Sequence, residues 1–236
     1  MRRHLLPTAA EAASFGADLV ADALIAAHAA GAAPILGVSG GSTPVPLYRA
    51  LAARADVPWP RVHIVWVDER MVPSTDERSN ERLVREALLD HVPVAPTHVH
   101  PVATTAGAPG AVAGAYDALL AALVGRDASA VGLTAAVMGV GEDGHTASLF
   151  PGAAPSWPVG ALAAHTVAPA TSPVPDRITL TPALLDRTGL AVVLVTGAAK
   201  TTIAARALGG ETALPAARLR ARGEVAWVLD AAANGG

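Results

Sequence analysis

The stretch PILGVSGGSTP, residues 34–44, has the pattern of a strand, a tight turn and the start of a helix. Residues 35–38 form a short apolar run, and Pro44 suits the first turn of a helix. The small residues between them permit two chemistries. Residues 37–41 fit the G-x-S-x-G turn of serine hydrolases, in which the serine is the nucleophile. Alternatively, the amides and hydroxyls of residues 39–43 form a cradle for a phosphate.

Strand and helix patterns alternate along the rest of the chain. Thr8 and Glu11 have capping-box spacing, which predicts the start of the first helix. We expect helices at 8–30, 44–53, 79–91, 111–124, 182–186 and 198–208, and strands at 35–38, 62–67, 98–100, 133–138, 162–167, 177–181, 190–196 and 225–229. This alternation predicts an α/β fold with a mostly parallel sheet and helices on both faces. The sequence contains no repeat or linker, so we expect a single domain over 1–236.

Composition excludes several classes of protein. The chain has 236 residues, a formal net charge of −3 and no basic tract, which argues against nucleic acid as a partner. It has no cysteine, which excludes disulfides, a thiol nucleophile and a zinc–thiolate site. No run approaches the roughly 18 apolar residues of a membrane span. Acidic residues at 11, 18 and 22 interrupt the N-terminal segment, so no signal peptide is expected and the cytoplasm is the expected location.

Four predicted strands end in residues that carry chemistry. Residues 39–43 follow the first of them, DER at 68–70 follows the second, and EDGH at 142–145 follows the third. Lys200 comes shortly after the strand at 190–196. Each group alone also fits an ordinary turn, helix cap or solvated strand end. Ligands of open α/β sheets bind at the carboxyl ends of strands, so the coincidence at four ends predicts one site.

Three other patterns compete with this interpretation. GVGEDG at 139–144 fits G-x-G-x-x-G, but no acidic residue lies between His145 and Pro175, which argues against dinucleotide binding. His98 and His100 share a face of a short strand and could bind a metal, but a surface strand is the favoured interpretation. A serine hydrolase would use residues 39, 68 and 145 in the Ser–Asp–His order. That reading leaves Arg177 and Lys200 without a role, whereas a phosphate gives both cations one.

Together these motifs resemble the 6-phosphogluconolactonase family. The resemblance rests on SGGSTP at 39–44, DER at 68–70, SN at 79–80, GEDGHTASLFPG at 141–152, RITLT at 177–181 and VTGAAK at 195–200. The motifs match in order from about residue 8 to 230, and the first and last are shared with glucosamine-6-phosphate deaminases. The resemblance implies a deaminase/isomerase-like fold, a Rossmann-like three-layer sandwich. It also implies hydrolysis of 6-phospho-D-glucono-1,5-lactone in the oxidative pentose phosphate pathway, without a cofactor or metal.

The resemblance also implies roles for individual residues. His145 matches the proposed general base, Asp143 would orient it, and Arg70 would stabilise the developing oxyanion or hold substrate oxygens. Asp68 and Asn80 would lie at the substrate with unassigned roles. The phosphate would be bound by Ser39, Gly40, Gly41, Ser42, Thr43, Arg177 and Lys200.

Two alternatives within the same fold stay open at this point. A glucosamine-6-phosphate deaminase would carry a glutamate in the stretch after the histidine, whereas residues 146–152 contain no acid. Such enzymes also tend to carry an aromatic residue where this chain has Arg70. A sugar-phosphate sensor would usually have a DNA-binding segment beside the domain, and the α/β pattern starts directly at the N-terminus. The expected partner is a small phosphosugar lactone, and a monomer is the simplest expectation for an oligomeric state that the sequence leaves open.

Overall fold

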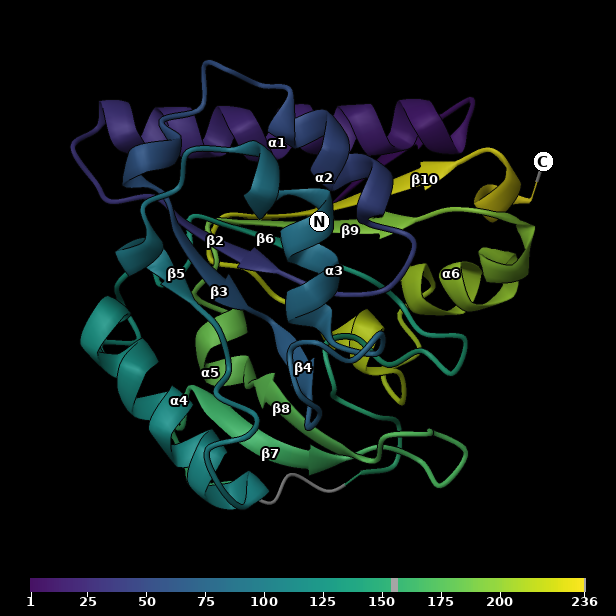
Figure 1. Cartoon of the computed structure of the whole chain (residues 1–236). Helices are drawn as coiled ribbons and strands as arrows, with labels where there is room; N and C mark the ends of the chain where they lie inside the picture. Colours follow the sequence, from purple (N-terminus) through teal and green to yellow (C-terminus); the bar gives the residue numbers. More distant parts are fainter. Residues whose placement is uncertain (154–156, 236) are drawn as a thin grey trace.

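The computed structural model describes residues 1–153 and 157–235 (Figure 1). The strands are β1 (Arg2–Leu6), β2 (Ile35–Val38), β3 (His63–Trp66), β4 (Asp68–Arg70), β5 (Val99–His100), β6 (Ala135–Met138), β7 (Ala163–Val167), β8 (Asp176–Leu180), β9 (Leu190–Val195) and β10 (Glu224–Asp230). The α-helices are α1 (Ala9–Ala29), α2 (Val45–Ala52), α3 (Asn80–Ala87), α4 (Pro109–Val124), α5 (Pro182–Leu185) and α6 (Thr201–Leu208). Every predicted helix and strand therefore has a counterpart, with ends shifted by a few residues.

The larger sheet has seven strands in the order β1-β10-β9-β6-β2-β3-β5, and every neighbouring pair is parallel. From β2 the chain moves through β3 to β5 in one direction. From β6 it moves through β9 to β10 in the opposite direction. The strand order thus reverses between the neighbours β2 and β6, which is where open α/β sheets bind their ligands. The carboxyl ends of β9, β6, β2 and β3 lie side by side, as the sequence predicted.

Helices cover both faces of the larger sheet. Figure 1 shows α1 and α2 above it, and α4 with a smaller sheet below it. The capping box predicted for α1 is present, because Thr8 Oγ1 accepts from the amide of Glu11 and donates to its carboxylate. By length and composition alone α1 is apolar enough to cross a membrane, but its inner face, including Val20 and Leu24, is fully buried in the core against β9 and β10. The helix α1 therefore packs against one face of the larger sheet.

The smaller sheet, β4-β8-β7, is antiparallel and was not predicted. The strands at 162–167 and 177–181 were predicted, but the alternation pattern gave no sign that they leave the parallel sheet. The crossing point is Val67, whose amide bonds to Val38 in the larger sheet and whose carbonyl accepts from Leu180 in the smaller one. One buried residue therefore carries the chain from β3 directly into β4.

Two further differences concern the ends and edges of elements. The edge strand β1 was missed because its mixed RRHLL sequence lacks an apolar run. The helix predicted over 79–91 ends at Ala87 and continues as a separate 3₁₀ turn, Leu89–His91. The segment 151–175 forms one strand, β7, as predicted, and residues 154–156 within it lie outside the described residues.

Candidate active site

A tight turn after β6 presents His145. The amide of Gly141 donates to the carbonyl of His145 at 2.8 Å, and the amide of Gly144 donates to Gly141 at 3.0 Å. A Cβ on Gly141 would lie 2.1 Å from His145 Nδ1, so the imidazole occupies the space that a side chain would need. Gly144 adopts φ +86° and packs against Leu214, which also requires glycine. The glycines of this motif therefore shape a platform for the histidine.

Asp143 and His145 form a hydrogen-bonded pair. His145 Nδ1 lies 2.6 Å from Asp143 Oδ1, and the same oxygen accepts from the His145 amide at 3.1 Å. Partial burial alone would raise the pKa of Asp143, but the hydrogen bonds and charge of His145 outweigh it and hold that pKa below its usual value. An ionised Asp143 fixes the proton on Nδ1, which leaves Nε2 as the nitrogen available to water. Phe150 contacts the ring, with centroids 5.0 Å apart.

Asp68 is held by side chains from two distant segments. Ser148 Oγ donates to Asp68 Oδ2 at 2.6 Å, and Asn80 Nδ2 donates to the carbonyl and to Oδ1 of Asp68 at 2.8 and 3.3 Å. Ser148 lies three residues after His145, so this contact joins the histidine segment to the start of β4. Asn80 is the first residue of α3, and a Cβ on Gly40 would come within 1.7 Å of its Oδ1. The loop after β2 therefore packs directly on Asn80.

The loop after β2 has a rigid backbone at Ser39. The Tyr48 hydroxyl accepts from the Ser39 amide at 2.8 Å and donates to its carbonyl at 2.7 Å. Gly41 follows with φ +92°, a conformation that favours glycine. Ser42 and Thr43 form the turn that leads into α2. Tyr48 on α2 therefore fixes the backbone of the loop that precedes this helix.

The predicted cations come from two parts of the fold: Arg70 and Arg177 from the smaller sheet, and Lys200 from the turn that precedes α6. Arg70 and Arg177 are register partners on β4 and β8. Burial first, and then the neighbouring Arg70, lowers the pKa of Arg177. Lys200 Nζ donates to the carbonyl of Val140 at 3.0 Å, immediately before the histidine turn. Adjacent guanidinium groups repel each other, so an anion between or beside them is favourable.

Three buried polar atoms of the predicted site have no hydrogen-bond partner among the described residues. They are Ser39 Oγ, Arg70 Nε and Asn80 Oδ1. Buried polar atoms of folded proteins normally have partners. A polar ligand that supplies donors and acceptors at this place would satisfy them.

The structure does not support Ser39 as a nucleophile. A nucleophile elbow strains the backbone of its serine. Among the described residues other than glycine, only Ala147 has a positive φ, at +50°. His145 hydrogen-bonds to Asp143, and Ser39 Oγ has no partner in the described part of the chain. The turn therefore fits the phosphate-cradle interpretation better.

Several residues that shape the site were not predicted. Ser148 and Glu69 lie inside motifs singled out in the sequence, but their partners come from remote segments. Tyr48 gave no signal beyond its place on a helix. Asp230 accepts from the amides of Gly197 and Ala233 and so shapes the turn before Lys200. All four act through contacts that a linear motif does not reveal.

A separate pocket of about 580 Å³ lies beyond the histidine segment, between β7, α5 and residues 215–219. Ser148 and Phe150 contribute to its wall, together with mostly apolar side chains. It contains none of the predicted site residues. This pocket is therefore separate from the residues that the sequence predicts to carry the chemistry.

Comparison with known proteins identifies the family of the chain. A family model described as glucosamine-6-phosphate isomerases/6-phosphogluconolactonase matches residues 7–227. The chain belongs to this family. A 6-phosphogluconolactonase of Mycobacterium leprae is 36% identical over 221 residues, which cover 89% of this chain and 88% of that protein. A relative from Synechocystis that is also named 6-phosphogluconolactonase is 36% identical over 199 residues, which cover 83% of this chain and 81% of that protein.

Solved structures show the same architecture. A 6-phosphogluconolactonase from Thermotoga maritima has a TM-score of 0.83 at 25% identity and covers 97% of this chain and 99% of its own. A monomeric glucosamine-6-phosphate deaminase has a TM-score of 0.80 at 20% identity, over 99% and 98% of the two chains. The second likeness concerns the fold alone. Lactonases and deaminases therefore share this architecture, and the site residues must separate them.

Proposed function

We propose that this member of the family hydrolyses 6-phospho-D-glucono-1,5-lactone to 6-phospho-D-gluconate in the oxidative pentose phosphate pathway. The observation that carries the proposal is the Asp143–His145 pair, at 2.6 Å, placed at the reversal of strand order. The curated relatives that are named 6-phosphogluconolactonase support the same assignment. The absence of an acid from residues 146–152 argues against a deaminase-type ring opening.

In the proposed reaction, His145 acts as a general base and then as a general acid. Its Nε2 takes a proton from water while the water oxygen attacks the lactone carbonyl carbon. Asp143 stabilises the imidazolium that forms, and Arg70 stabilises the tetrahedral oxyanion. When the intermediate collapses, the bond to the ring oxygen breaks and the imidazolium returns the proton to that oxygen. The products are a hydroxyl and a carboxylic acid, and the acid releases its proton to solvent at neutral pH to give the carboxylate.

The phosphate is proposed to bind beside this pair. The hydroxyls of this loop and the amides of residues 40–43 offer donors at the start of α2, which suits an anion, whereas the Ser39 amide is held by Tyr48. Lys200 adds positive charge from the turn before α6, and Arg177 adds it from β8. Asp68 and Asn80 lie between the cradle and the histidine segment and are proposed to hold hydroxyls of the sugar.

We also propose that the enzyme works as a monomer in the cytoplasm and needs no metal. The Asp143–His145 pair provides the base that a metal-bound hydroxide would otherwise supply. Dialysis against EDTA is therefore expected to leave the rate of lactone hydrolysis unchanged, measured against an undialysed sample. A loss of rate that zinc or magnesium restores would contradict this part of the proposal.

The test is acceleration of lactone hydrolysis above the spontaneous rate. Glucose-6-phosphate dehydrogenase generates the lactone in situ, and 6-phosphogluconate dehydrogenase reports the product. We expect a clear acceleration that scales with the concentration of this protein. A folded protein that gives no acceleration would contradict the proposal, and ammonia release from glucosamine 6-phosphate would then test the deaminase alternative. Failure of both assays would favour a sugar-phosphate sensor.

A further inference from the structure

Glu69 is the one residue of the DER motif for which the proposed reaction has no role. Its neighbours Asp68 and Arg70 point to the opposite side of β4, because successive side chains of a strand alternate. Glu69 is only 1% exposed, and its carboxylate accepts four hydrogen bonds. The donors are the amides of Arg70, Asn80 and Glu81, at 2.7, 2.8 and 2.6 Å, and Ser79 Oγ at 3.1 Å.

Three of these donors belong to the N-terminus of α3. The first amides of a helix lack partners within the helix, and a negative charge there is favourable. Ser79 is the cap residue, but its Oγ accepts from the Arg82 amide at a long 3.3 Å. Glu69 accepts from the two amides that follow Ser79 in sequence. A side chain from the sheet thus completes the cap of α3 and ties that helix to β4.

This tie determines where Asn80 lies. Asn80 is the first residue of α3, and its side chain contacts both Asp68 and the loop at Gly40. A shift of the helix terminus would therefore move Asn80 relative to Asp68 and to the phosphate cradle. Glu69 itself contacts neither the cradle nor His145. Its influence on the site passes through Asn80 and through the Arg70 backbone.

The carboxylate is kept buried at a cost to stability. Burial raises the pKa of Glu69 to about 6, although the amides of Asn80, Arg70 and Glu81 act in the opposite direction. Because this folded-state pKa exceeds the ordinary value of 4.5, charging Glu69 lowers the stability of the fold as pH rises through 6. The surrounding charged and titratable groups are Asp68 and Arg70 on β4, Glu81 on α3, Arg177 on β8 and Tyr116 on α4.

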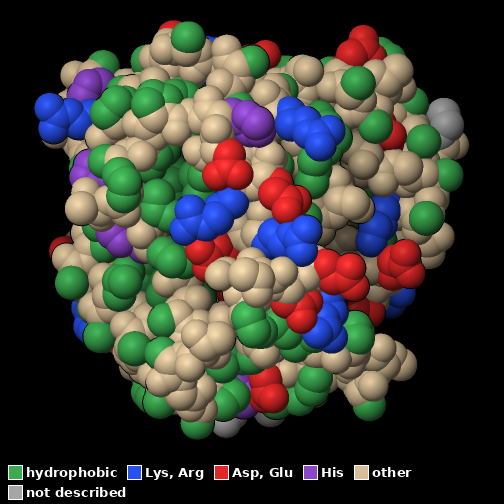
Figure 2. All heavy atoms as spheres, in the orientation of Figure 1, with side chains coloured by type: hydrophobic (Ala, Val, Ile, Leu, Met, Phe, Trp, Pro, Cys, Tyr) green, Lys and Arg blue, Asp and Glu red, His purple; other side chains and the backbone are tan. Residues whose placement is uncertain are grey.

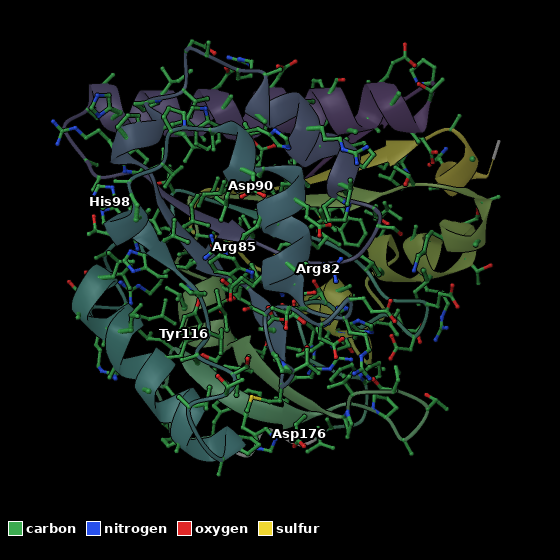
Figure 3. The ribbon with its side chains drawn as sticks, in the orientation of Figure 1. Arg82, Arg85, Asp90, His98, Tyr116 and Asp176 are labelled. Atoms are coloured by element: carbon green, nitrogen blue, oxygen red, sulfur yellow. The ribbon has the colours of Figure 1, made fainter. Side chains whose placement is uncertain are left out.

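The outer face of α3, unlike the buried N-terminus at Glu69, carries exposed ion pairs. Acidic and basic side chains alternate over α3 in the centre of Figure 2, and Figure 3 labels Arg82 and Arg85 on this helix. Arg82 pairs with Glu86 and Arg85 pairs with Glu81, each one turn apart. Such exposed pairs contribute little to stability. Glu86 therefore offers a matched carboxylate on the same helix, away from the site.

We propose that Glu69 is a positioning residue for the lactone hydrolysis, whose charged carboxylate holds the N-terminus of α3, and with it Asn80, in place beside Asp68. The inference rests on the proposed function for its effect on rate. Protonation of Glu69 removes an acceptor from the helix terminus and loosens Asn80. The proposal therefore includes an acid-side loss of activity that does not originate at His145.

The test compares Glu69→Gln with Glu86→Gln. Glutamine has the shape of a protonated glutamate and cannot accept all four hydrogen bonds. We expect kcat/KM of Glu69→Gln at pH 7.5 to fall by about tenfold to a hundredfold, the usual effect of losing hydrogen bonds to a charged group. Glu86→Gln should stay within about twofold of the unsubstituted protein. The thermal midpoint of Glu69→Gln should fall by less than about 5 °C, because the cost of the buried charge is also removed.

The pH profile separates positioning from a general loss of structure. The ratio of the rate of the unsubstituted protein to that of Glu69→Gln should decrease as pH falls from 7.5 to 5, with a midpoint near 6. A constant ratio, or full activity of the variant, would overturn the proposal.

A second measurement does not depend on the variant or on turnover. The side-chain amide of Asn80, followed by NMR in protein labelled with ¹⁵N-asparagine, should shift with the same midpoint. An Asn80 amide that does not respond between pH 5 and 7.5 would overturn the proposal even if Glu69→Gln fails to fold. Absence of lactone hydrolysis would instead contradict the proposed function while the amide titration still holds.

Discussion

The two ends of the parallel sheet both carry histidine, but in opposite surroundings. At the carboxyl end, His145 is partly exposed and hydrogen-bonded to the carboxylate of Asp143. At the amino end, His63 on β3 contacts two other histidines. Its Nδ1 lies 2.9 Å from Nε2 of His100, and its ring stacks on that of His98, labelled in Figure 3, at 4.0 Å. Burial, reinforced by the other two imidazoles, lowers the pKa of His63 to about 4.

A neighbouring carboxylate makes a histidine useful for proton transfer. An imidazole beside a carboxylate has a fixed tautomer and a stabilised charged form, whereas an imidazole among imidazoles is held neutral. The histidine cluster also lacks acidic ligands, and the described residues contain no group of three or more His, Asp or Glu side chains arranged to hold a metal. The sequence left open a metal site at His98 and His100. In the structure both side chains contact His63 at the edge of the sheet, and no carboxylate joins them among the described residues.

The largest expected effect separates the two ends directly. His145→Ala should lower kcat by about 10²-fold to 10⁴-fold, the usual contribution of a general acid–base group, and leave binding of 6-phosphogluconate largely intact. His100→Ala, at the other end, should change kcat by less than about twofold. The two variants are compared by their rates in the coupled assay and by their affinities for 6-phosphogluconate. Equal losses for the two variants would remove the distinction between the ends.

Removing a cation from the carboxyl end should weaken substrate binding. Lys200→Met keeps the length of the side chain but loses the ammonium group. We expect kcat/KM to fall by about tenfold to a hundredfold, mainly through KM, because hydrogen bonds to charged groups contribute about 1.5–3 kcal/mol. Arg206→Met, on the exposed face of α6, the helix that begins after Lys200, is the matched control. A fall confined to kcat would place Lys200 at the reacting carbonyl instead of the phosphate.

A smaller effect is expected at the cradle itself. Ser39→Ala removes one hydroxyl and leaves the backbone fixed by Tyr48. KM should rise by about tenfold, with kcat nearly unchanged, because the variant loses one hydrogen bond to the phosphate but no positive charge, which places it at the low end of the roughly 1.5–3 kcal/mol of hydrogen bonds to charged groups. Covalent labelling of Ser39 by a fluorophosphonate, detected by mass spectrometry, would contradict this and revive the serine-hydrolase interpretation.

The smallest expected effect concerns stability at the amino end. Unfolding restores the ordinary pKa of His63, so the unfolded chain binds a proton first as pH falls from 6.5 towards 4. The stability that neutral His63 provides above pH 6.5 is lost over that interval. His63→Gln should therefore reduce the fall in thermal midpoint between pH 7 and pH 5 by about 2–4 °C. Calorimetry at both values measures this, and an unchanged fall would contradict the assignment to His63.

Local patterns predicted most of the fold. The capping box at Thr8, the apolar run at 35–38 and the strand–helix alternation are signals carried by neighbouring residues, and all were confirmed. The antiparallel sheet was not predictable in this way. Its existence depends on Val67, which bonds to Val38 and Leu180 from remote parts of the chain.

The site was predictable as a set of strand ends but not as a network. The rule for open α/β sheets brought together the ends of β2, β3, β6 and β9, and the strand order confirms that they are neighbours. The contact between Asp68 and Ser148, which are 80 positions apart, could not be read from spacing. The stacking of His63 on His98 was missed for the same reason. The individual roles of Arg70, Asp68 and Lys200 stay predictions.

The role of His145 as a base is tested most directly by rescue of His145→Ala with free imidazole. We expect imidazole to restore part of the rate of lactone hydrolysis in a saturable manner, above the rate in protein-free imidazole buffer. The restored rate should follow the concentration of neutral imidazole, because the missing group is a base at this position. A variant whose rate rises no more than the protein-free control would contradict the claim that an imidazole beside Asp143 activates the water.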